Sequence, residues 1–148
     1  MTELAIDPEF ASLCTPHSAD EAAALAWQIA NEGCREPLTV WAETGLLLDG
    51  HLRYRICSER GLPFDLLERS FADRDAAAEW IITNQLGRRN VTPRARAYLV
   101  GKLYLAQRGP RGNRQAVGCT AADKVAAMFD TSPRTVERNG RFAAAVDA

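Results

Sequence analysis

The stretch that decides the fold of this chain is Leu47-Leu48-Asp49-Gly50-His51-Leu52-Arg53-Tyr54-Arg55. It begins as an apolar, strand-like run, reaches a glycine, and continues with basic side chains in the predicted first turns of a helix. A helix N-terminus presents free N–H groups and a positive dipole end, and an arginine can hold a phosphate through two parallel hydrogen bonds. The stretch therefore predicts an anion site. The alternative is that Arg53 and Arg55 form ion pairs within an acidic part of the chain.

Around this stretch, the first ninety residues mix helix and strand signals. A capping box at Ser18 and Glu21 begins a helix that ends near Gly33, and Asp73 caps a later helix. Short apolar runs predict three strands, of which the first two are expected to form a hairpin. The predicted helices cover 18–33, 52–60 and 73–88, and the predicted strands 38–41, 46–48 and 64–67. Residues 1–91 are therefore predicted to form an α+β domain.

From Thr92 onward the pattern is purely helical, so residues 92–148 are predicted to form a second, all-α domain. Thr92 and Pro93 supply a cap and a first helical residue, and Gly109 is expected to end that helix. A capping box at Thr120 and a further cap at Ser132 begin two more helices. These two helices cover about 121–129 and 133–146.

Composition excludes several classes of protein. The 148 residues are 47% hydrophobic and 25% charged, and no apolar run approaches the length of roughly 18 residues that crosses a membrane. The acidic start of the chain does not have the layout of a secretion signal, so we expect a cytoplasmic protein. The four cysteines lie far apart and are predicted to be reduced, mostly buried thiols rather than metal ligands. Trp27, Trp41 and Trp80 are each predicted to be core aromatics.

Charge is divided unevenly along the chain. Residues 1–86 carry 6 basic and 15 acidic side chains, a net charge of −9, whereas residues 87–148 carry 12 and 4, a net charge of +8. Clustered basic residues gain free energy on a phosphate backbone through counterion release. The second half is therefore a candidate for binding a polyanion, although the two halves could also simply neutralise each other.

The last two predicted helices match a helix-turn-helix at about 120–146. Ala126 precedes a turn at Asp130, and Ser132-Pro133-Arg134-Thr135-Val136-Glu137-Arg138 begins the second helix in the manner typical of DNA-binding proteins. The spacing places three arginines on one helix face and Val136 on the opposite face. We expect double-stranded DNA as the partner. The predicted DNA contacts are Arg111, Arg114, Arg134, Thr135, Arg138 and Arg141. The competing interpretation is a helical hairpin with solvated arginines.

Four features follow one another along nearly the whole chain. They are the capped helix ending at Gly33 before Pro37-Leu38-Thr39-Val40, the stretch from Asp49 to Arg55, the run Asn84-Gln85-Leu86-Gly87-Arg88, and Thr92-Pro93 before a helical domain. Their order and spacing resemble the ParB-like family. The resemblance implies a small ParB/sulfiredoxin-like domain with a short mixed sheet, followed by a helix-turn-helix domain. It further implies DNA binding in plasmid or chromosome partition or in transcriptional regulation, and a possible homodimer.

The resemblance also implies a nucleotide site. In chromosome-partitioning ParB proteins, a Gly-x-x-Arg-x-Arg segment and a Glu-Asn-x-Gln-Arg segment together hold the phosphates and Mg²⁺ of CTP. The positions of this chain that correspond to the two segments are Gly50, His51, Arg53, Arg55, Asn84, Gln85 and Arg88. The resemblance thus implies CTP with Mg²⁺ as a ligand shared by the two segments.

Departures from the family pattern bear on enzymatic activity. Asn84 stands at the acidic position of the second segment, and an amide cannot accept a proton from water, so CTP hydrolysis is not expected. Sulfiredoxin activity needs a cysteine where this chain has His51. No catalytic residue and no metal ligand is therefore assigned. The alternative is a ParB-fold enzyme, a metal-dependent nuclease or phosphotransferase, in which Asp49 and His51 act and the helix-turn-helix only targets DNA.

Overall fold

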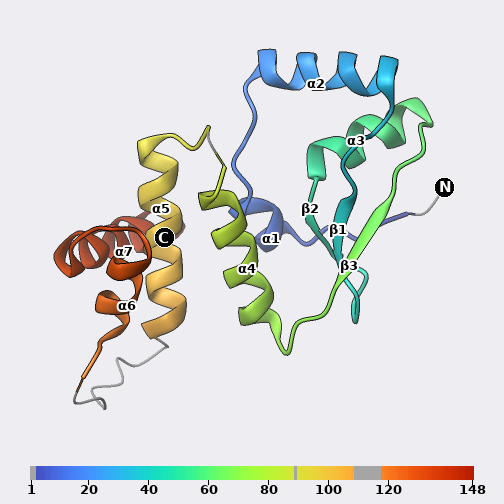
Figure 1. Cartoon of the computed structure of the whole chain (residues 1–148). Helices are drawn as coiled ribbons and strands as arrows, with labels where there is room; N and C mark the ends of the chain where they lie inside the picture. The colour runs from blue at the N-terminus through green and yellow to red at the C-terminus, as the bar shows by residue number, and fades with distance from the viewer. Residues whose placement is uncertain (1–2, 89, 109–117) are drawn as a thin grey trace. The chain divides into compact units, whose positions relative to one another are not determined.

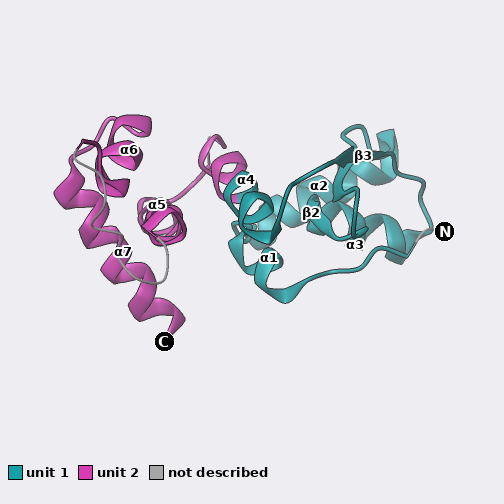
Figure 2. Cartoon of the chain, turned by 90° about the horizontal axis from the view of Figure 1, so that it is seen from below, with its two compact units in different colours: residues 1–81 teal, residues 82–148 magenta. Residues whose placement is uncertain are grey.

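The computed structural model describes residues 3–88, 90–108 and 118–148 (Figure 1). Arg111 and Arg114, two of the predicted DNA contacts, lie outside the described residues. The chain divides into two compact units, residues 1–81 and 82–148 (Figure 2), each of which is described by itself below. The division falls inside the helix that precedes the boundary predicted between residues 91 and 92.

The first unit holds the sheet and the helices that surround it. Its helices are α1 (Pro8–Leu13), α2 (Ala19–Glu32), α3 (His51–Arg60) and the first part of α4 (Arg74–Leu86). Its strands are β1 (Leu38–Trp41), β2 (Leu47–Asp49) and β3 (Leu66–Arg69). The described chain is thus α+β, as the sequence predicts.

The sheet is mixed and has the strand order β2-β1-β3. β1 pairs with β2 antiparallel, which confirms the predicted hairpin, and pairs with β3 parallel with Leu38 opposite Leu66. The central strand β1 and the strand β2 are buried along their whole length, whereas all four residues of β3 are exposed. The third strand is therefore an exposed edge, and it begins two residues later than the apolar run at Phe64 suggests.

Local sequence signals account for most of the helix ends in this unit. Ser18 and Glu21 form the predicted capping box of α2, and Gly33 ends that helix with φ 79°. The helix α1 was not predicted from the sequence, although Asp7 caps it and Pro8 stands at its first position. That cap and that proline were the signal that could have revealed it.

Two sequence predictions about side-chain burial are wrong. Trp27 is 67% exposed on α2, whereas Trp41 is buried. Among the cysteines, only Cys57 is buried; Cys14 and Cys34 are half-buried and Cys119 is exposed. In both cases the apolar pattern shows that a helix or strand has a buried face, but not how completely its neighbours cover each residue.

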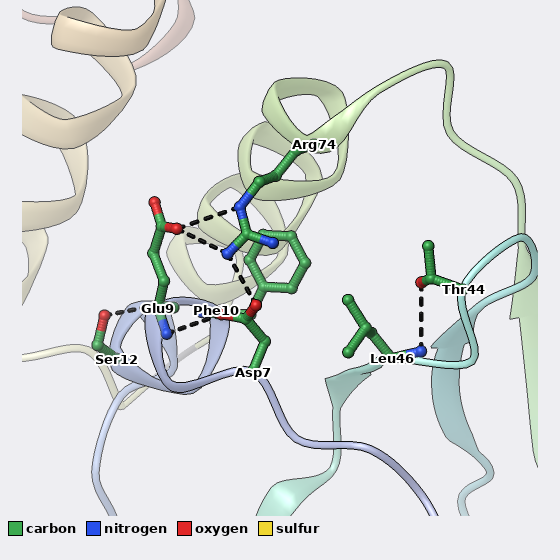
Figure 3. Close-up of polar contacts among 7 residues, drawn as sticks. All are labelled: Asp7, Glu9, Phe10, Ser12, Thr44, Leu46 and Arg74. Carbon is green, nitrogen blue, oxygen red and sulfur yellow. Dashed lines mark hydrogen bonds and ion pairs between the residues drawn. The ribbon is translucent and has the colours of Figure 1, made fainter.

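Within the first unit, an arginine on α4 binds α1 and the residue that caps it (Figure 3). Arg74 Nη2 lies 2.8 Å from Asp7 Oδ2 and 2.7 Å from Glu9 Oε2, and its guanidinium lies 4.4 Å from the centre of the Phe10 ring. Phe10 is fully buried. The hydrogen bond from Arg74, supported by two backbone N–H groups, lowers the pKa of Asp7.

The second unit is formed by helices. They are the end of α4, α5 (Pro93–Arg108), α6 (Ala121–Met128) and α7 (Pro133–Asp147), with α5 packed against both α6 and α7. α5 and α7 come close because glycines lie at their crossing. A Cβ on Gly101 would meet the backbone of Asn139, and one on Gly140 would lie 2.5 Å from the ring of Tyr104. Among the described residues, no helix has the length and apolar character needed to cross a bilayer.

Candidate anion site and candidate nucleic-acid interface

Gly50 makes the turn between β2 and α3 and is the N-cap of α3. Its backbone is left-handed, with φ 94°, which favours glycine. A Cβ at this position would lie 2.6 Å from Leu38 Cδ2 and 3.1 Å from Arg53 Nη2. The strand-glycine-helix pattern is thus confirmed as a tight turn, and internal packing already requires the glycine.

Arg53 lies in the first turn of α3 and is bound by two carboxylates. Its guanidinium forms an ion pair with Glu36 and lies 3.3 Å from Asp49 Oδ2. It also donates to the Pro37 carbonyl at 3.5 Å. The side chain is only 14% exposed. Arg53 therefore forms the ion pairs that the alternative interpretation of the sequence expects, but they lie in a half-buried position rather than on an open surface.

Two nitrogen atoms at the start of α3 remain unsatisfied. Arg53 Nε and His51 Nε2 are buried and have no hydrogen-bond partner among the described residues. Buried N–H groups normally have a partner, because an unpaired donor costs about 1–3 kcal/mol. An anion or an ordered water at this helix N-terminus would supply the missing acceptor.

His51 contacts Cys14 with its other ring nitrogen. Its Nδ1 lies 3.5 Å from Cys14 Sγ, and the thiol is also 3.7 Å from the Leu48 carbonyl oxygen. Burial lowers the pKa of His51, and the negative charge of Asp49 opposes that shift. The imidazole is therefore neutral at neutral pH.

The remaining residues of the first segment point elsewhere. Arg55 is exposed, and its position two residues beyond Arg53 places the two side chains on different faces of the helix. The Tyr54 hydroxyl accepts a hydrogen bond from the Leu4 N–H at 3.0 Å. Of the predicted residues in this segment, the structure brings together Gly50, His51 and Arg53.

The predicted residues of the second segment belong to the other unit. Gln85 is fully buried, Asn84 and Arg88 are half-buried, and the Arg88 N–H donates to the Gln85 carbonyl at 3.1 Å. Since the division of the chain falls after Ile81, the first and second segments lie in different units. That they share one ligand stays a prediction from the sequence.

Sequence reasoning missed three partners in the first unit. Glu36 lies 17 residues before Arg53, and Cys14 lies 37 residues before His51, so no local pattern could pair them. Asp49 stands directly before the N-cap Gly50, but the described helix α3 has no side-chain cap and Asp49 binds Arg53. The four-residue spacing from Asp49 to Arg53 was the available signal.

The exposed face of α7 carries three arginines. Arg134, Arg138 and Arg141 are all exposed, and none has an ion pair or hydrogen bond among the described residues. The opposite face is buried through Val136, Gly140 and Ala143. The separation of the charged face from the packing face agrees with the sequence prediction.

The turn before α7 has the backbone that the sequence pattern requires. Asp130 is left-handed, with φ 48°, and the Thr131 N–H donates to the Ala126 carbonyl at 3.0 Å. Ser132 then caps α7 by accepting from the Thr135 N–H, and its hydroxyl lies 2.9 Å from the Thr135 hydroxyl. Thr135, a predicted DNA contact, is thus half-buried and already hydrogen-bonded within the cap.

Comparison with known proteins identifies the fold. An α+β unit with a three-stranded mixed sheet, followed by helices, is the arrangement of a ParB-N-like fold. A solved Pnob8-like ParB-N domain, in its C2221 form, is similar over 86% of this chain, with a TM-score of 0.56 and 23% identity. The chain spans 44% of the length of that solved chain. No family model matches the sequence. No curated protein matches it either.

Proposed function

We propose that this chain is a ParB-like protein that binds double-stranded DNA through the exposed face of α7. The observation that carries the proposal is the set Arg134, Arg138 and Arg141, whose guanidinium groups are exposed and unpaired within the described residues. Arg74 in the first unit, by contrast, is paired with two carboxylates. Unpaired arginines aligned on one helix face can instead bind phosphates or base edges without first breaking an ion pair.

The helices around α7 support this assignment. α6 and α7 are joined by a short left-handed turn at Asp130, and both pack on α5. In a helix-turn-helix, the second helix enters the major groove and its first turns face the bases. We assign Arg134 and Arg138 to base edges and Arg141 to phosphate, and we keep Arg111 and Arg114 as proposed phosphate contacts. The biological role would be partition of a plasmid or chromosome, or transcriptional regulation, and the protein could act as a homodimer.

Selection of bound fragments from random duplexes, followed by affinity measurements, tests the proposal. The double variant Arg134→Gln plus Arg138→Gln should lose most of its affinity for the selected duplex. Arg60→Gln is the matched control, since it removes a positive charge from an exposed position of the first unit. An unchanged affinity in the double variant, or an equal loss in the control, would overturn the proposal.

A second candidate activity is anion binding at the start of α3. The specific observation in its favour is the pair of buried, unsatisfied nitrogens Arg53 Nε and His51 Nε2. Arg53 Nε is an N–H donor, and His51 Nε2 is a donor in the tautomer whose Nδ1 accepts from the Cys14 thiol. A phosphate group, such as one from CTP, fits donors of this kind. Mg²⁺ stays part of this proposal as the companion ion of CTP, because it is held mainly by the phosphates and by water and needs only one or two protein oxygens.

Titration of CTP, ATP and pyrophosphate against the wild-type chain and Arg53→Gln tests anion binding. The wild type should bind at least one of the three, and Arg53→Gln should weaken that binding at least tenfold. Arg55→Gln, two residues along the same helix but exposed, is the control and should leave it unchanged. Equal binding by all three proteins, or no binding, would remove this candidate.

A further inference from the structure

Two cysteines distant in sequence meet in the first unit. Cys57 on α3 is fully buried in a cluster with Ile29 and Ile56, and Cys34, just after α2, packs against this cluster. The Cys34 thiol lies near enough to raise the pKa of Cys57. It donates a hydrogen bond to the Glu36 carbonyl at 3.4 Å.

The contact between the cysteines lies next to the Arg53 ion pair. Cys57 is four residues after Arg53 and therefore one turn further along the same helix face. Cys34 is two residues before Glu36, and Glu36 is the residue that binds Arg53. The segment 34–36 thus contacts α3 twice, once through Cys34 and Cys57 and once through Glu36 and Arg53.

We propose that Cys34 and Cys57 are a redox pair, which a peroxide oxidises to a disulfide that ties segment 33–37 to α3 beside Arg53. The Cys34 thiolate attacks one peroxide oxygen, the O–O bond breaks, and Cys34 becomes a sulfenic acid with release of water. Cys57 then loses its proton and attacks the Cys34 sulfur, forming the S–S bond and releasing a second water. Two thiols and one hydrogen peroxide give one disulfide and two waters, so each sulfur loses one electron and the peroxide gains two.

The difference in burial decides which of the two thiols reacts first with the peroxide. Cys34 is half-buried and can meet a solvent oxidant first, whereas Cys57 is enclosed by the cluster. Burial, and after it the neighbouring Cys34 thiol, raise the pKa of the Cys57 thiol to about 11. A thiol with such a pKa is protonated at neutral pH and reacts slowly with a free oxidant. Cys57 therefore acts as the resolving partner.

Peptide mapping of the oxidised full chain tests this pairing. After treatment with hydrogen peroxide and blocking of free thiols, the chain is digested without reduction. Trypsin alone leaves Cys14 and Cys34 on one peptide, because the first basic residue of the chain is Arg35. Adding a glutamate-specific protease cuts after Glu32 and separates them. The expected product is a peptide beginning at Gly33 joined to one beginning at Ile56, which dithiothreitol separates.

The thermal midpoint gives an independent readout of the same bond. Oxidation should raise the Tm of the first unit, followed by tryptophan fluorescence, by roughly 5 °C or more, because the disulfide limits the unfolded chain. Cys34→Ser and Cys57→Ala should each abolish both the linked peptide and the shift, and Cys119→Ser should retain both. Absence of the linked peptide in the wild type, or a Tm rise that persists in Cys34→Ser, would overturn the proposal.

Discussion

Gly101 on α5 faces the backbone of Asn139 on α7 so closely that a Cβ at Gly101 would lie 2.6 Å from the Asn139 carbonyl carbon. The same Cβ would lie 2.9 Å from Ala143 Cβ. The missing side chain therefore sets the distance between the two helices, and with it the position of the helix that carries the exposed arginines.

Replacement of Gly101 by alanine should destabilise the second unit. In an open helix the change would stabilise by up to about 1 kcal/mol, because glycine has a poor helix propensity. Here the added methyl group meets a backbone that cannot rotate away, so a net loss of about 1–3 kcal/mol is expected. Far-UV circular dichroism during urea unfolding measures it. Gly87→Ala is the control, since its Cβ would meet only ordinary contacts, at 3.5 Å and beyond.

Removal of the Arg74 side-chain charge should weaken the attachment of α1. Arg74→Met loses two ion pairs and the contact with the Phe10 ring, and we expect a cost of about 1 kcal/mol. Tryptophan fluorescence measures this loss, because all three tryptophans lie in the first unit. Arg60→Met, with an exposed arginine on α3, should cost less.

The hydrogen bond between Arg74 and Asp7 should make the stability of the first unit depend on pH in the acidic range. The hydrogen bond from Arg74 lowers the pKa of Asp7 below its ordinary value of 3.8. A carboxyl group with a lowered folded pKa contributes its stability fully above the unfolded value, and that contribution disappears as the pH falls through the folded pKa. The difference in the free energy of unfolding between the wild type and Arg74→Met should therefore decrease below about pH 4. A stability difference that stays constant down to pH 2 would contradict this.

His51 should resist protonation. Burial lowers its pKa below 6.5 despite the opposing charge of Asp49, so the folded state binds a proton less readily than the unfolded chain. The stability contribution of the neutral ring is complete above pH 6.5 and decreases as the pH falls below it. Proton NMR of the two histidines measures the shift directly, with His17→Gln to assign the His51 signal. Asp49→Asn should lower the pKa of His51 further, and a rise in that variant would be inconsistent with this account.

Replacement of the arginines on α7 should change how the affinity for DNA depends on salt concentration. Arg141, which we assign to a phosphate, should contribute about −0.9 to the slope of log K against log salt concentration. Arg141→Gln should therefore make the slope less steep by about 1, whereas Arg134→Gln and Arg138→Gln, at base edges, should mainly reduce the preference for the selected duplex. Glu137→Gln, which removes a negative charge from the same helix, should instead increase the affinity. Slopes that do not change across these variants would place the DNA contacts elsewhere.

Local signals predicted the helix ends well. Ser18, Thr120 and Ser132 each cap a helix as expected, since each accepts a hydrogen bond from a backbone N–H only three residues away. The turn at Asp130 was also expected, and the residue there is left-handed. These features depend on atoms that are neighbours in the chain, and so they can be read from a short window of sequence.

The amino-acid sequence by itself determined the α+β then all-α order of elements, the β1–β2 hairpin, the strand-glycine-helix turn at Gly50 and the arginine face of α7. Only the tertiary structure decided that Arg53 binds Glu36, that Cys34 meets Cys57, and that Trp27 is left exposed. The physical reason is distance along the chain. Caps and helix faces follow from backbone geometry over a few residues, whereas burial and long-range pairing depend on which distant surfaces the folded chain brings together.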